Sequence, residues 1–323
     1  MASTLPDPRW TGGFCIHDNC PLASMSIAYP GKGTTRVQKT PNLEMRFPPL
    51  PRTVSEVSRL MSEGGSAPNT PRLVEVIHSD PVMATAVLRR VNSAYFGMRR
   101  HVTEIKKAVF LLGFLEVSNI VLTAAILKLR EIVKTSAQEQ IFESIMRSSV
   151  GTAVFALELA TYLNLPGKES AFTAGLLHGS GRLVLLFNYP LEYEKIFFSG
   201  VDGVFPTSEI EHSLFGLDHT KLNGLAGEHW NLPEDITNII KYYLFPGHIQ
   251  DDRIRKLALS VAVGSSATEQ LCMIPGRNDL QFEAKTALRI LARTSHSTPQ
   301  DLIKLIQARR KLVTEYIHTM VYC

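Results

Sequence analysis

The run Ala171-Phe-Thr-Ala-Gly-Leu-Leu-His178-Gly179-Ser-Gly-Arg-Leu-Val-Leu-Leu186 decides the fold of this chain of 323 residues. Its apolar residues predict helix, and they surround one imidazole, His178, with aliphatic side chains. A histidine in such surroundings is more often a buried residue with a hydrogen bond than a metal ligand. The next residue, Gly179, has no side-chain donor atom. The run therefore predicts helix, in which His178 makes one buried hydrogen bond.

The same helical pattern recurs along the chain. It begins at Thr53 and stops at Gly64-Gly65, and Asp80-Pro81 supplies a capping carboxylate and a first-turn proline. Thr103 resembles a capped helix start, and a break is expected near Gly113. No stretch alternates as a strand does, so the fold class is all-α. Helices are expected at about 53–63, 74–77, 82–91, 108–129, 140–163, 170–187, 208–214, 221–230, 233–243, 254–271 and 299–321.

Four further motifs stand upstream of His178 in a fixed order. They are Phe47-Pro-Pro-Leu-Pro51, His78-Ser-Asp-Pro81, Val91-Asn-Ser-Ala-Tyr-Phe-Gly97 and Ala108-Val-Phe-Leu-Leu-Gly113. Together with the run around His178 they resemble the HDOD domain, the HD-related output domain of bacterial signalling proteins. The resemblance extends from about Phe47 to Tyr243, and it implies an HD-like multi-helix bundle with additional C-terminal helices.

Composition suggests three segments. Residues 1–45 are rich in proline and glycine and predict a flexible extension, residues 46–250 the HDOD domain, and residues 251–323 a C-terminal helical segment. The four cysteines are too few and too scattered for a disulfide framework. The cluster Cys15-Ile-His17-Asp18-Asn-Cys20 has metal-binding residue types, but its spacing matches no common zinc module.

The resemblance also indicates where an HD metal site would stand. HD phosphohydrolases read Gly-Leu-Leu-His-Asp-Ile-Gly-Lys at the run that opens this section, so Gly179 takes the place of the metal-binding aspartate. Their first histidine corresponds to Ser148, and His219 matches a family histidine. A later His-His pair corresponds to Tyr242 and Tyr243.

The last aspartate expected by the resemblance is also missing, since residues 254–268 contain no acidic residue. Two imidazoles cannot offset the charge of a divalent cation in a partly dry pocket. We therefore expect no metal, no cofactor and no enzymatic activity, with Tyr242 and Tyr243 filling the space of the lost ligands. The alternative is a divergent phosphohydrolase that rebuilds its site with Asp218 or Glu228, although these residues are more often surface groups.

The signature Asn92-Ser93-Ala-Tyr95-Phe96-Gly97 supplies no metal ligand and needs its own explanation. We favour an architectural role, in which Asn92 and Ser93 bond to exposed backbone groups at a helix end and Tyr95 and Phe96 pack inward. Gly97 would then take a positive φ in the turn. The functional alternative is that these residues form a surface for a partner.

Charge and hydropathy bound the partners. The formal net charge is +4, and residues 251–323 hold 11 Lys and Arg against 7 Asp and Glu, which is no concentrated basic stripe. The charge therefore does not indicate nucleic-acid binding. A nucleotide or nucleic-acid sensor is kept as a third functional hypothesis, after the regulatory module and the phosphohydrolase. No uninterrupted apolar run approaches the roughly 20 residues needed to cross a bilayer, and the N-terminus lacks a basic region followed by an apolar one, so a cytoplasmic protein is expected.

The expected function is that of a non-catalytic regulatory module that binds other signalling proteins, because the HDOD resemblance implies that role. The last helix, at 299–321, has an apolar stripe formed by Leu302, Leu305, Ile306, Leu312, Val313, Tyr316, Ile317 and Met320. Such a stripe is more often core than a homodimer seam. Both interpretations stay open at this point.

Overall fold

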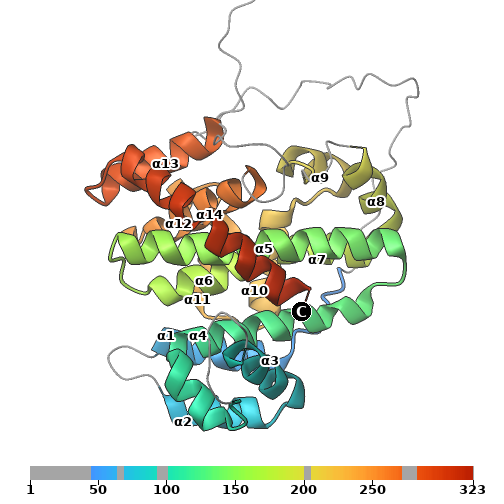
Figure 1. Ribbon diagram of the computed structural model, residues 1–323. Coiled ribbons are helices and arrows are strands. Elements are labelled where there is room, and N and C mark those ends of the chain that lie inside the picture. The colour runs from blue at the N-terminus through green and yellow to red at the C-terminus, as the bar shows by residue number, and fades with distance from the viewer. Residues whose placement is uncertain (1–44, 64–68, 93–100, 200–204, 271–281, 323) are drawn as a thin grey trace, which may run out of the picture. The chain divides into compact units, whose positions relative to one another are not determined.

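The computed structural model describes residues 45–63, 69–92, 101–199, 205–270 and 282–322 (Figure 1). Within these ranges the chain is helical and contains no strand, which confirms the all-α prediction. The predicted flexible extension and the cysteine cluster lie outside the described residues. The helices are α1 (Arg52–Glu63), α2 (Thr70–His78), α3 (Pro81–Val91), α4 (Ile105–Leu127), α5 (Ser136–Tyr162), α6 (Lys168–Leu177), α7 (Ser180–Asn188), α8 (Pro190–Phe198), α9 (Ser208–Phe215), α10 (His219–His229), α11 (Glu234–Tyr242), α12 (Asp252–Thr268), α13 (Phe282–Thr294) and α14 (Pro299–Val321).

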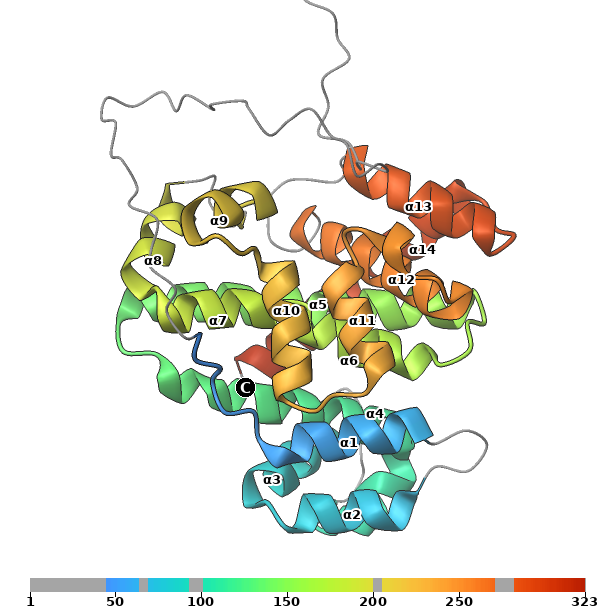
Figure 2. The same cartoon turned by 180° about the vertical axis from the view of Figure 1, so that it is seen from behind.

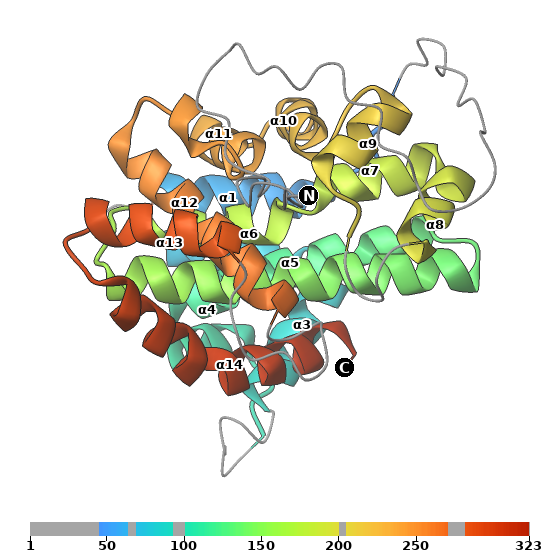
Figure 3. The same cartoon turned by 90° about the horizontal axis from the view of Figure 1, so that it is seen from above.

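Helix α5 is the element around which the others pack. It contacts α6, α12 and α14, and its residues from Ile141 to Ala160 supply much of the buried core. Figure 3 shows α14 on one side of α5 and α10 with α11 on the other. Residues 39–323 form one compact unit, in which α12 and α14 of the C-terminal segment pack directly on α5.

Two predicted helix boundaries have clear local causes and one is wrong. The Asp80 side chain accepts a hydrogen bond from the Val82 amide at 2.9 Å and so caps α3, as predicted. Gly113 adopts φ +81°, which interrupts α4 at the predicted break. The start of α4 is not capped by Thr103, because the helix begins at Ile105 after Glu104, whose side chain makes no capping bond.

The Asn92 side chain joins the end of α3 to the residues just before α4 by hydrogen bonds. Its side-chain amide donates to the carbonyls of Leu88 and Val102, each at 2.8 Å, and its side-chain oxygen accepts from the Val102 amide at 2.8 Å. Asn92 is thereby bonded directly to the backbone of Val102. This geometry fits the architectural role expected for Asn92, while Ser93, Tyr95, Phe96 and Gly97 lie outside the described residues.

The apolar stripe of the last helix is mostly internal. Leu302, Ile306, Val313, Tyr316 and Ile317 are buried, and α14 packs against α5, α4 and α13 of the same chain. These residues therefore serve the core of one molecule. A homodimer through this helix would have to use its other face.

Four features of the fold differ from the sequence-based expectations. Helices α8 and α13 were not predicted, and the single helix expected at 170–187 is divided into α6 and α7 at residues 178–179. In addition, among the described residues one helical segment, Ile105–Glu131, is long and apolar enough to cross a membrane by length and composition, although no such run was expected. Its most apolar window is 56% buried inside the protein, and α4 packs against α1, α2 and α3. A core helix passes the same test.

Candidate functional site

Three of the predicted positions meet in the interior. His178 ends α6, His219 begins α10, and Tyr243 follows α11. The Tyr243 ring stands edge-on to His178 with centroids 5.4 Å apart, and it lies 6.2 Å from the His219 ring. Figure 2 shows α6, α7, α10 and α11 side by side at this point. The fold therefore brings these three side chains together.

Both ring nitrogens of His178 are engaged. Nδ1 lies 2.7 Å from the Gly175 carbonyl oxygen, so Nδ1 carries the proton and donates it. Nε2 then accepts from the Ser265 hydroxyl at 3.4 Å. Complete burial and the nearby positive charge of Arg182 lower the pKa of His178 from 6.5 to about 3. At neutral pH this imidazole is uncharged and bonded on both sides.

His219 is held by a carboxylate that the sequence analysis missed. Glu211 of α9 accepts from the His219 backbone amide at 2.8 Å and from the ring Nδ1 at 2.5 Å. The other ring nitrogen, Nε2, lies 2.9 Å from the Tyr243 hydroxyl. All three side chains are buried. His219 is therefore fixed between an acid and a phenol.

Arg182 provides the counter-charge for this cluster. Its Nε lies 3.6 Å from Glu211 Oε1, both side chains are buried, and its guanidinium stacks on the Phe205 ring at 4.6 Å. Burial alone would raise the pKa of the Glu211 carboxyl, but the charge and hydrogen bond of His219 and the charge of Arg182 lower it. Glu211 is therefore an anion in a dry interior, stabilised by an arginine and a histidine.

Asn223 of α10 ties the surrounding helices together. Its side-chain nitrogen donates to the carbonyls of His178 at 2.7 Å and Ile240 at 3.0 Å. Its side-chain oxygen accepts from the Ser180 hydroxyl at 3.0 Å and the Gly181 amide at 2.6 Å. One amide thus satisfies four polar groups at the α6–α7 junction and at α11, which fixes the backbone on which the cluster is mounted.

Two glycines at the junction between α6 and α7 are closely packed against their neighbours. A β-carbon on Gly179 would lie 2.7 Å from the Ser149 hydroxyl oxygen and 3.0 Å from Ile145 Cγ2. A β-carbon on Gly181 would lie 2.0 Å from the backbone oxygen of His219. The position at which HD phosphohydrolases carry an aspartate is therefore packed against α5.

The remaining predicted site residues lie in different surroundings. Ser148 is buried, and its hydroxyl has no hydrogen-bond partner among the described residues. Tyr242 is half-buried and contacts Lys241 and His248, so only Tyr243 fills the site. Glu228 is exposed, as expected. Asp218 is not a surface group, because it is buried and caps α10 by accepting from the amides of Thr220 and Lys221.

Negative charge near the cluster comes from residues outside the family pattern. Glu269 follows directly on the acid-free stretch 254–268. Burial raises the pKa of Tyr243, the charge of Arg182 lowers it, and the charge of Glu269 raises it further. Within the described ranges no group of three or more His, Cys, Asp or Glu side chains is placed to hold a metal ion. The cluster consists of hydrogen-bonded and ion-paired groups.

These elements define an all-α protein built on the HD plan. The sequence model of the HDOD domain family matches residues 47–244, which is more than half of the chain, so the chain belongs to the HDOD family. An uncharacterized protein of Treponema pallidum (strain Nichols) is 24% identical over 201 residues, which is 61% of this chain and 37% of that protein. The chain thus spans little more than a third of that relative.

Solved structures have the same fold. An HDOD domain protein of unknown function from Geobacter sulfurreducens has a TM-score of 0.69 and 17% identity, covering 85% of this chain and 93% of its own. A candidate signal transduction protein from Marinobacter aquaeolei VT8 has a TM-score of 0.63 and 20% identity, and the match covers 85% of this chain and 60% of that protein. A candidate phosphohydrolase from Shewanella amazonensis SB2B has a TM-score of 0.60 and 20% identity, covering 85% and 95%. At these identities the likeness concerns the fold.

Proposed function

We propose that this chain is a non-catalytic regulatory module of the HDOD type, which acts in the cytoplasm of a bacterial cell by binding another signalling protein. The observation that carries the proposal is the filled interior around His178. In a metal-dependent phosphohydrolase the same space holds cations that activate water and neutralise phosphate charge. Here it holds hydrogen-bonded side chains and a buried arginine.

The residues present do not fit a divalent cation. Each ring nitrogen of His178 and His219 already has a partner within the protein. Glu211, the carboxylate that accepts from His219, also contacts Arg182. A cation would therefore have to displace an arginine whose charge already balances that carboxylate, at a cost of several kcal/mol.

The packing at Gly179 also disfavours a metal site. Restoring an aspartate there requires movement of Ser149 and Ile145 on α5, the helix at the centre of the fold. The site therefore differs from a catalytic one in its charge balance and in its shape. A binding role requires neither metal nor an open pocket at this place.

The names of the structural neighbours point to two activities, signal transduction and phosphohydrolysis, and the divergent phosphohydrolase is the competing function. The test is hydrolysis of phosphate monoesters, diesters and nucleotides by the full chain with Mn²⁺, Fe²⁺ or Zn²⁺ supplied. We expect turnover indistinguishable from that of a His178→Asn variant. Metal-dependent turnover that disappears in this variant would show that the chain is an enzyme.

A further inference from the structure

The outer face of α8 carries two large apolar side chains that the fold leaves in solvent. Leu191 is 64% exposed and Phe198 is 49% exposed. They are seven residues apart, which is nearly two full turns, so they lie on the same side of the helix, about 10 Å apart along its axis. Figure 3 shows α8 at the edge of the helical bundle, next to α7. Apolar residues that gather on one exposed face are typical of an interaction surface.

The opposite face of α8 is fixed to the core. Tyr193 and Phe197 are buried, and the Tyr193 hydroxyl donates to Glu211 at 3.4 Å. The Phe197 ring packs on the Phe205 ring, with centroids 5.6 Å apart. The helix therefore cannot turn its outer face inward without breaking these contacts. That face stays available to a partner.

Two charged side chains accompany the apolar pair. Lys195 lies one turn after Leu191 on the same face, and Glu192 is exposed on its flank. Neither charged side chain forms an ion pair or a hydrogen bond with another described residue. The exposed charges are thus one cation and one anion, whereas a membrane or a nucleic acid requires an excess of cations. This balance allows the face to bind a copy of itself.

A two-fold axis makes the face complementary to itself. When the axis passes midway between Leu191 and Phe198 and the two helices run antiparallel, Leu191 lies opposite Phe198 of the partner subunit, and the reverse contact forms as well. The two copies of Lys195 then lie near the axis. With a rise of about 1.5 Å per residue, Glu192 of the partner subunit stands about 3 Å further along the helix, within reach of the lysine side chain.

We propose that the outer face of α8 is the contact surface of a two-fold homodimer, in which Leu191 packs against Phe198 of the partner subunit and Lys195 pairs with Glu192 of the partner subunit. The inference goes beyond the proposed function and does not depend on it, because the His178 cluster takes no part. One helix face buries less than the ~800 Å² per subunit of a standard interface, so the dimer is reversible, with a Kd of about 1–100 µM.

The first test measures the mass of the full chain by sedimentation equilibrium from about 1 to about 200 µM. Leu191→Glu and Phe198→Glu are compared with Leu225→Glu, which changes a leucine of α10 that is 41% exposed. We expect wild type and Leu225→Glu to shift from monomer to dimer over this range, whereas both α8 variants stay monomeric. Urea denaturation checks that each variant is folded.

The second test uses the charges of the face. Glu192→Lys leaves two cations on each copy and Lys195→Glu leaves two anions, so we expect each variant alone to dimerise about tenfold more weakly than wild type. The two variants mixed in equal amounts should form a heterodimer. The double variant should dimerise like wild type, because opposite charges face each other again. A folding defect cannot produce this recovery.

A wild-type chain that stays monomeric over the whole concentration range would overturn the inference. If Leu191→Glu also lowered the stability of that monomer, the face would be covered by another segment of the same chain. A dimer that no substitution on α8 weakens would overturn the inference as well, since the contact would then lie elsewhere. Variants of Glu192 and Lys195 that show no preference for each other would refute the antiparallel arrangement.

Discussion

Replacing His178 by asparagine should change how stability depends on pH. In the folded chain burial, followed by the charge of Arg182, lowers the pKa of His178 to about 3, whereas the unfolded chain has the ordinary value of 6.5. Between pH 6.5 and pH 3 the unfolded chain therefore binds a proton at His178, whereas His178 stays neutral in the folded chain. The stabilisation is fully present above pH 6.5 and is lost as the pH falls towards 3.

The magnitude follows from the two pKa values. Between pH 7.5 and pH 4.5 the proton taken up by the unfolded chain at this one site costs about 3 kcal/mol of folding free energy. Asparagine can still donate to the Gly175 carbonyl but does not titrate. The variant should be less stable than wild type at pH 7.5, and this difference should narrow by about 3 kcal/mol at pH 4.5.

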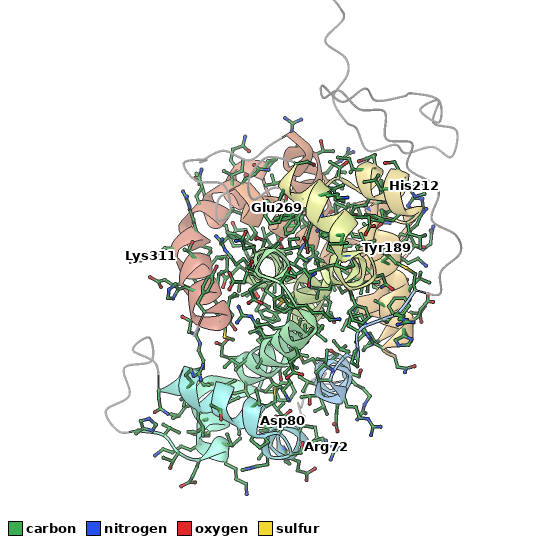
Figure 4. All side chains as sticks on the ribbon, turned by 90° about the vertical axis from the view of Figure 1, so that its right-hand side faces the viewer. Arg72, Asp80, Tyr189, His212, Glu269 and Lys311 are labelled. Atoms are coloured by element: carbon green, nitrogen blue, oxygen red, sulfur yellow. The ribbon has the colours of Figure 1, made fainter. Side chains whose placement is uncertain are left out.

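The assay is urea denaturation of both proteins at the two pH values, with EDTA present so that metal does not contribute. His212→Asn is the control, because it removes an exposed imidazole (labelled in Figure 4). Comparing the difference between variant and wild type cancels the titration of all other groups. An unchanged difference at the two pH values would refute the assignment of His178 as a buried neutral residue.

Three further substitutions test individual contacts of the fold by urea denaturation. Gly181→Ala should cost about 3 kcal/mol of folding stability or prevent folding, because its β-carbon would lie 2.0 Å from the backbone oxygen of His219. The control is Gly247→Ala, which should leave stability unchanged because nothing lies within 4 Å of an added β-carbon. Equal stabilities of the two variants would contradict the close approach at Gly181. Tyr243→Phe should cost about 1–2 kcal/mol through loss of the bond to His219, and an unchanged midpoint would argue against that bond. Asn92→Ala should cost about 2–3 kcal/mol, because three backbone groups lose their partner, and a cost near zero would refute the architectural role.

The fold was largely predictable because its signals are local. Capping at Asp80, the break at Gly113 and the helical period of α14 depend on residues close in sequence. The two missed helices show the limits of such signals. In α8 most residues are exposed or half-buried, with only Tyr193 and Phe197 buried, so the apolar period is weak.

The candidate site was predictable only in part. The family resemblance located His178, His219 and Tyr243, but not the two groups that hold them. Glu211 shares a short helix with the exposed Glu209, and nothing in the local pattern distinguishes the acid that faces the core. Arg182 stands where the HD motif has its lysine. That correspondence was a signal for a cation in the site, but its pairing with Glu211 depends on tertiary packing.

The most direct test of the central claim is elemental analysis of the full chain, purified without chelator or affinity metal and then incubated with Fe²⁺, Mn²⁺ or Zn²⁺ and desalted. The His178→Asn variant, treated in parallel, is the control for adventitious metal. A closed cluster predicts no stoichiometric metal in either protein. An equivalent of metal per chain in wild type that is absent from the variant would contradict the account and identify a working HD site.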